Sequence, residues 1–106
     1  MKCVPPLTHL QFAVLDSLLN GESSGQELRS SIAKRGFKKT GPGFYQLMQR
    51  LEEGRFVESR IVPVIIGDQT YRERRYKLTG HGERACAQTV QFYMHAQSAQ
   101  GGLLNA

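Results

Sequence analysis

The feature that most constrains the fold of this chain is a change of hydrophobic period at Gly54. Before Gly54, apolar residues recur every three or four positions in three short segments, which is the spacing of amphipathic helices. After Gly54, β-branched and aromatic residues dominate, and Gly67-Asp68-Gln69 supplies the reversal of a two-stranded hairpin. Few architectures join three short helices to one hairpin.

Each helical segment has residues that can start or stop it. Thr8 can cap a first helix with apolar residues from Phe12 to Leu19, and Gly21 stops it. A second helix is expected over residues 25–35, and a third begins after Thr40. The third has apolar residues at i, i+3, i+4 and i+7, which predict one buried face: Phe44, Leu47, Met48 and Leu51.

The hairpin is expected to form a basic wing at the edge of the fold, followed by one more helix. Pro63 argues that the first strand lies at an edge, and a last helix is expected over residues 80–98 before a flexible tail at 99–106. The predicted fold is therefore mainly α with a small β-hairpin wing. We expect a single domain over residues 1–106, in which a winged helix-turn-helix (7–79) with a three-helix core carries a C-terminal dimerisation helix.

The charge pattern favours a polyanionic partner. The chain carries 14 Lys and Arg against 9 Asp and Glu, a net charge of +5, and thirteen of the basic residues lie between Arg29 and Arg84. From Ala85 to Ala106 there is no charged side chain other than histidine. A basic but inert surface is the alternative, and the distribution of the basic residues has to decide between the two.

The third helix is the candidate DNA-reading element, because the second helix of a helix-turn-helix enters the major groove. Its outer face has residue types that can bond to base edges or phosphates: Tyr45, Gln46, Gln49 and Arg50. Its start combines positive charge with backbone amides open to an oxyanion, at Lys38, Lys39, Thr40, Gly41 and Gly43. The alternatives are an ordinary solvated helix face and glycines that only shape a turn.

Two further groups complete the predicted sites. Arg72 and Arg74 lie on one face of the return strand and can reach the DNA backbone or minor groove, although such charges also guard exposed sheet edges. The last helix is apolar over most of its circumference, which predicts burial on a second copy of the chain. The expected dimer contacts are Cys86, Val90, Tyr93 and Met94. Packing on its own domain alone is the alternative.

No pattern of residues predicts catalysis or a cofactor. Cys3 and Cys86 lack metal-ligand spacing, the three histidines form no recognisable triad or metal cluster, and a Walker loop is absent. We therefore expect a protein that is not an enzyme and has no metal. With no membrane span and no secretory signal in the sequence, we expect a cytoplasmic location.

Three blocks of this sequence together resemble the PadR-like family of winged-helix transcriptional regulators. They are LLNGESSGQEL, FYQLMQRLEEGRFVES and RRYKLTGHGERA, which include Tyr45, Tyr76 and Gly82 at positions typical of the family. The chain differs in having Pro42-Gly43 before Tyr45, and the family's turn glycine usually falls one place later than Gly54. The resemblance implies a homodimer, often a repressor. Some members of the family bind small molecules between their subunits, so an effector at the dimer interface is also consistent with the resemblance.

The leading hypothesis is a sequence-specific, DNA-binding transcriptional regulator that acts as a homodimer. In it the third helix reads the major groove of double-stranded DNA, and the wing lies on the backbone or in the minor groove. The alternative is a winged-helix module that binds protein without reading DNA. It is supported by the uncharged run Ile61 to Ile66, which is more apolar than a free hairpin needs.

Overall fold

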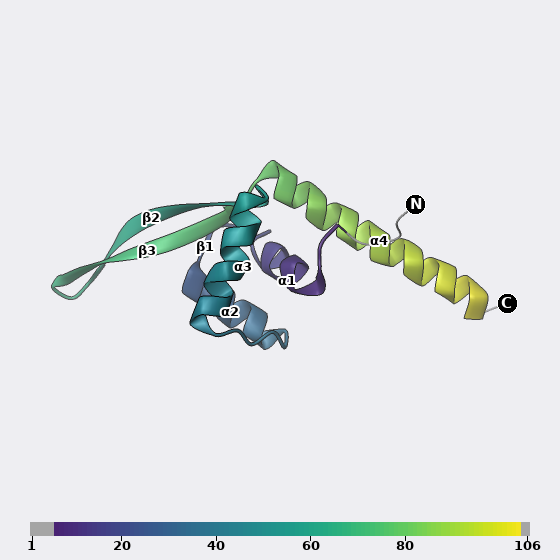
Figure 1. The fold of residues 1–106 in the computed structure, drawn as a ribbon, viewed down its shortest axis with the longest axis horizontal. Helices are drawn as coiled ribbons and strands as arrows, with labels where there is room; N and C mark the ends of the chain where they lie inside the picture. The colour runs from purple at the N-terminus through teal and green to yellow at the C-terminus, as the bar shows by residue number, and fades with distance from the viewer. Residues whose placement is uncertain (1–5, 105–106) are drawn as a thin grey trace.

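The computed structural model describes the backbone of residues 6–104 and the side chains of residues 6–96. The elements follow the predicted order, and the predicted fold class is confirmed (Figure 1). They are α1 (His9–Ser17), β1 (Ser23–Ser24), α2 (Gly25–Lys34), α3 (Gly41–Glu53), β2 (Val57–Ile66), β3 (Gln69–Leu78) and α4 (Gly80–Leu104).

The first three helices begin at capping residues that the sequence makes available. Thr8 and Ser24 each form a capping box, in which the cap hydroxyl accepts a bond from the backbone three residues on and a Gln or Glu side chain bonds back to the cap. At α3, the Thr40 hydroxyl accepts a bond from the Gly43 N–H at 3.1 Å. Because these interactions join residues only three positions apart, the sequence alone is enough to predict where these helices begin.

The sheet has the strand order β1-β3-β2 and is antiparallel throughout. β2 and β3 pair over their full lengths, from Val57 opposite Leu78 to Ile66 opposite Gln69, and Gly67 makes the turn with φ 62°. β1, which the sequence did not predict, pairs Ser23 with Tyr76. This two-residue strand connects the turn between α1 and α2 to the base of the wing.

The core lies where α1, α2 and α3 meet the base of the wing and the first turns of α4. Its largest fully buried side chains include Leu15, Leu28, Ile32, Met48 and Leu51. Leu18 is buried but Leu19, which the sequence placed in the apolar stripe of the first helix, is 51% exposed because α1 ends at Ser17.

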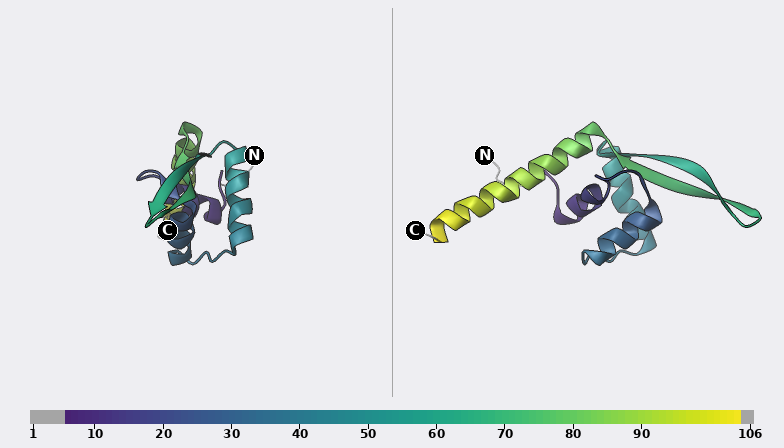
Figure 2. Two further views of the ribbon diagram at one scale, coloured as in Figure 1. Left: turned by 90° about the vertical axis from the view of Figure 1, so that its left-hand side faces the viewer. Right: turned by 180° about the vertical axis from the view of Figure 1, so that it is seen from behind.

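The molecule is elongated, because the wing and α4 project from the body in opposite directions (Figures 1 and 2). Its radius of gyration is 16.7 Å, against about 13 Å for a compact domain of this length. α4 continues through Leu104, so residues 99–104 are helical where a tail was predicted; residues 105–106 lie outside the described range. Within the described residues, no helix combines the length and the apolar character that a membrane span requires.

Candidate nucleic-acid interface

α3 lies on the surface of the body and divides into a buried and an exposed face. Phe44, Met48 and Leu51 are buried, as the spacing predicted, and Leu47 is half-buried. The four side chains predicted to read DNA are all exposed: Tyr45, Gln46, Gln49 and Arg50. Their polar groups are therefore free to meet a ligand along one side of the helix.

The start of α3 is supported by a residue that the sequence did not single out. Arg29, on α2, donates a hydrogen bond from Nε to the Lys39 carbonyl oxygen at 2.9 Å. Its guanidinium also approaches Gly41, where an added Cβ would lie 3.8 Å from Nη1. Lys38 is exposed and Lys39 half-buried. Arg29 thus adds a cation beside the first turn of α3, and only the packing of α2 against the loop places it there.

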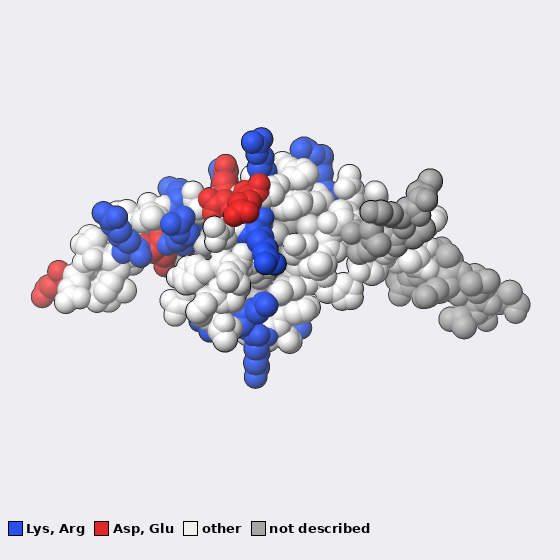
Figure 3. All heavy atoms as spheres, viewed as in Figure 1, with Lys and Arg blue, Asp and Glu red and all other residues white. Residues whose placement is uncertain are grey.

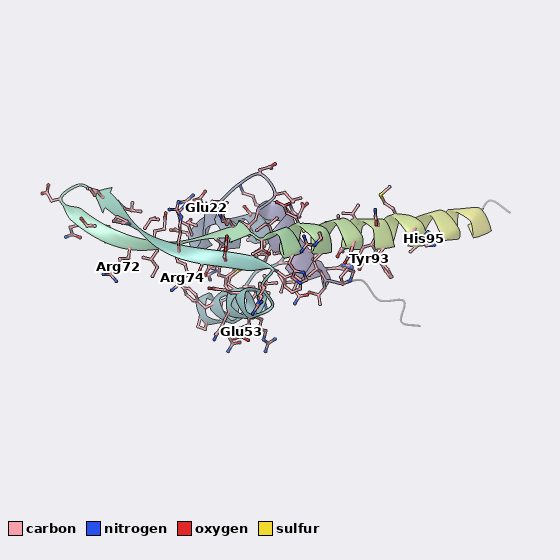
Figure 4. All side chains as sticks on the ribbon, turned by 90° about the horizontal axis from the view of Figure 1, so that it is seen from above. Glu22, Glu53, Arg72, Arg74, Tyr93 and His95 are labelled. Carbon is pink, nitrogen blue, oxygen red and sulfur yellow. The ribbon has the colours of Figure 1, made fainter. Side chains whose placement is uncertain are left out.

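Arg72 and Arg74 project from the wing on the side where α3 lies (Figure 4). Arg74 donates from Nη1 to Ser59 Oγ at 2.9 Å, and Ser59 in turn donates to the Glu52 carboxylate at 3.1 Å. These bonds link β3 through β2 to the last turn of α3. Arg72 is exposed and forms no ion pair with any residue that the structure describes.

The other cations of the wing are paired on its opposite side, where Glu22 lies (Figure 4). Glu22 accepts hydrogen bonds from Arg60 at 2.9 and 3.0 Å and from Arg75 at 2.9 Å. These bonds, chiefly those from Arg60, hold the pKa of the Glu22 carboxyl below its usual value. Lys77 pairs with Glu58 at 3.4 Å. The wing therefore has one side with compensated charges and one with available arginines.

Charge is also divided along α3. Glu52 and Glu53 are exposed at its C-terminal end, where Figure 3 shows an acidic cluster, and basic side chains lie beside and below this cluster and along the wing. The first turn of α3 contains no acidic residue. A polyanion would therefore be attracted to the start of α3, to Arg50 and to the wing, and repelled from Glu52 and Glu53 at the C-terminal end of α3.

An open cleft of about 510 Å³ separates α2 and α3 from the wing. Its walls include Arg29 and Tyr45 on the helical side and Val64, Arg72 and Arg74 on the wing side. The cleft brings together predicted site residues from α3 and β3 that are more than 20 positions apart in the sequence. It has both apolar and cationic groups, which suits a ligand with aromatic rings and negative charge.

α4 presents a different surface. Cys86 was predicted to contact a partner, but its side chain is 3% exposed and belongs to the core of its own domain, so it offers no surface to another chain. Burial raises the pKa of this thiol to about 11. Val90, Tyr93 and Met94 are exposed at 42%, 39% and 64%. Tyr93 Oη and His9 Nε2 share a hydrogen bond of 2.7 Å, which joins α4 to α1.

The described residues contain no group of three or more His, Cys, Asp or Glu side chains that could hold a metal ion.

A three-helix core with a basic hairpin beside an exposed third helix defines the winged helix-turn-helix class. Within this class, the chain has the fold of the PadR family of transcription regulators, and the resemblance seen in the sequence is confirmed.

Solved structures show this likeness. A PadR-family regulator from Clostridium difficile has a TM-score of 0.76 at 15% identity, over 92% of this chain and 99% of the other. A PadR-family regulator from Eggerthella lenta gives 0.68 at 25% identity, over 90% and 80%. Bacillus subtilis PadR in complex with operator DNA gives 0.61 at 23% identity, over 74% and 45%. No family model and no curated protein matches the sequence.

Proposed function

We propose that this protein is a sequence-specific regulator of transcription that binds double-stranded DNA. The observation that carries this proposal is the position of Arg72 and Arg74, which project from the wing on the side where α3 lies (Figure 4). One DNA duplex can then meet both elements at once. The structural likeness to the Bacillus subtilis PadR that was solved with operator DNA supports the same function.

In this proposal, α3 lies in the major groove along the side that carries Tyr45, Gln46, Gln49 and Arg50. Gln46 and Gln49 can each bond to adenine through two hydrogen bonds, and Arg50 can do so to guanine. The start of α3 would hold a backbone phosphate through Lys38, Lys39 and the Gly41 amide. The Gly43 amide is already bonded to the Thr40 hydroxyl, so Gly43 and Thr40 would shape this turn without donating to the phosphate. Glu52 and Glu53 would stay outside the groove, because phosphates repel them.

The wing supplies the second contact. Arg72 and Arg74 would bind phosphates or enter the minor groove, where the negative potential favours arginine. Contacts of this kind position a protein on DNA, and the base edges read by α3 supply the specificity.

We further infer that two copies associate through the exposed side of α4 and act as a repressor. Val90, Tyr93 and Met94 are apolar or aromatic and exposed, and α4 projects beyond the body, which is the kind of surface that a second copy would cover (Figure 1). Two-fold symmetry would place two α3 helices about 34 Å apart, on successive major grooves. A groove of about 310 Å³ beside this surface, lined by Phe12, Phe37 and Tyr93, could receive an effector.

A second function has one observation in its favour. Ile61, Ile65 and Ile66 of the wing are 50%, 75% and 63% exposed, which is the kind of surface that a protein partner covers. A winged-helix module for protein binding would use this apolar part of the wing and not its arginines.

The test measures DNA affinity against salt for the wild type and for a variant with Arg72→Ala and Arg74→Ala. The probe is a duplex enriched by the wild type from a random-sequence pool. The affinity of the wild type should fall about a thousandfold or more between about 50 and 200 mM salt, and the variant should have a slope lower by up to about 2.

Lys77→Ala is the matched control, because it removes a cation from the opposite side of the same strand, where Lys77 pairs with Glu58. It should change the slope little. Failure of the wild type to enrich any sequence, or a double variant with unchanged affinity, would contradict the proposed interface. Unchanged DNA binding with loss of a captured protein partner would favour the second function.

A further inference from the structure

The ion-pair network at Glu22 connects the body to both strands of the wing. Glu22 lies in the turn between α1 and α2, and its carboxylate binds Arg60 of β2 and Arg75 of β3 at 2.9 Å each. The Glu22 carbonyl oxygen also accepts a bond from Arg75 at 3.4 Å. Arg75 further pairs with Glu73 at 2.9 Å and Glu27 at 3.8 Å. One turn of the body is thus bonded to two neighbouring strands.

The register explains why the wing needs this carboxylate. Arg60 and Arg75 are direct cross-strand partners, so their like charges lie side by side on one face of the hairpin. Such a pair destabilises a hairpin unless an anion lies between the two side chains. Glu22 supplies that anion from outside the hairpin, so the compensation of charge also holds the wing against the body.

The same contacts are the outermost direct polar contacts between wing and body; on the α3 side, the bond from Ser59 to Glu52 lies one residue nearer the body. Val57 and Tyr76 anchor the base of the wing in the core, and Arg60 and Arg75 follow them toward the tip. Among the described residues, no side chain of residues 61–74 forms a hydrogen bond or ion pair with the helices or with β1. Arg72 lies three residues, about 10 Å, beyond Arg75 along β3. A rotation of the wing about Arg60 and Arg75 would therefore displace Arg72 relative to α3.

We propose that Glu22 is a positioning residue for DNA recognition. By binding Arg60 and Arg75 on the side of the wing away from α3, it fixes the angle of the hairpin and keeps Arg72 and Arg74 on the α3 side. This inference rests on the proposed function. It assigns the role to a residue that does not itself touch DNA.

The proposed role of Glu22 predicts different effects on specific and on non-specific DNA binding. Non-specific affinity depends on the number of available cations, whereas specific affinity needs the wing and α3 to fit one duplex together. Loss of the Glu22 contacts should therefore weaken specific binding selectively. A role in charge alone would change both kinds of binding in the same direction.

The experiment compares Glu22→Gln with Glu58→Gln. Each variant removes one negative charge from the same side of the wing base, but Glu58 forms only an exposed pair with Lys77. Affinities are measured for the enriched duplex and for a random duplex of the same length. Relative to Glu58→Gln, Glu22→Gln should lose about tenfold for the enriched duplex, whereas its affinity for the random duplex should rise, because no carboxylate then pairs Arg60 and Arg75. Glu58→Gln should change the two affinities equally.

A second measurement needs no DNA. Hydrogen exchange at backbone amides of residues 61–74 should accelerate in Glu22→Gln and not in Glu58→Gln, while core amides of both variants stay protected. Equal behaviour of the two variants in exchange and in binding would overturn the proposal. Failure of the wild type to select any sequence would instead contradict the proposed function, so the two failures are distinguishable.

Discussion

Replacing Gly82 with alanine should destabilise this protein, although alanine is the better helix former. Gly82 lies in the first turn of α4, where its N–H donates to Thr79 Oγ1 at 3.0 Å. Thr79 donates its own N–H to the Phe56 carbonyl oxygen at 3.1 Å. The start of α4 therefore rests directly on the backbone that joins α3 to β2.

The size of the effect follows from the available space. A Cβ on Gly82 would lie 2.1 Å from the Phe56 carbonyl oxygen and 3.0 Å from Leu78 Cδ2. The first contact involves backbone, so α4 must shift by roughly 1 Å and weaken the bonds of Thr79. Overpacking of this kind costs about 3 kcal/mol, and the helix propensity of alanine recovers at most about 1 kcal/mol. The expected net loss is about 2 kcal/mol, or a Tm lower by about 10 °C.

The assay is thermal unfolding followed by circular dichroism at a fixed protein concentration, because association couples to stability. Gly80→Ala is the control: its Cβ would meet only the flexible end of Arg84, at 3.3 Å, and it should leave the Tm unchanged or slightly higher. If Gly82→Ala were as stable as Gly80→Ala, the close approach of α4 to Phe56 would be refuted.

Three further predictions concern other parts of the chain. Arg55 follows the C-cap of α3 with φ 62°, a conformation that favours glycine, so Arg55→Gly should raise the free energy of unfolding by up to about 1 kcal/mol in urea titrations; a loss would contradict this. The raised pKa of Cys86 means that its contribution to stability is complete below pH 9 and is lost as pH rises toward 11. Urea titrations at several pH values should therefore show a steeper decline over this range for the wild type than for Cys86→Ala. Met94→Glu should dissociate the proposed dimer in sedimentation experiments, whereas Gln88→Glu, on another side of α4, should not.

Much of the fold could be predicted because its determinants are local. The buried face of α3 follows from a spacing of three and four residues, and its start follows from Thr40 and the amide of Gly43. The wing was predicted from the β-branched and aromatic residues between Phe56 and Ile66 and from the reversal at Gly67-Asp68-Gln69. In contrast, β1 has only two residues and no periodicity, so nothing in the sequence could have revealed it.

Arg55, which follows the C-cap of α3, has a left-handed backbone conformation. The resembling family usually has its turn glycine one place after Gly54, and in this chain Arg55 occupies that place with a positive φ. The left-handed conformation is therefore present at this place although the residue is not a glycine. The need for a left-handed residue arises from the way α3 ends, and an arginine can meet it at a cost in backbone energy.

The sequence by itself determined the helices, the hairpin, the caps of α1 and α3, and the residue types that suit DNA. The alternation of side chains along the return strand already separates Arg75 from Arg72 and Arg74. Only the tertiary structure decided which of the two faces is neutralised. Glu22 is 38 positions from Arg60 and 53 from Arg75, and it binds both of these arginines on the side of the wing away from α3. The tertiary structure likewise decided that the side chain of Cys86 is buried in the core of its own domain. The physical reason is that periodicity and capping act within a few residues, whereas ion pairs and burial depend on which distant segments the fold brings together.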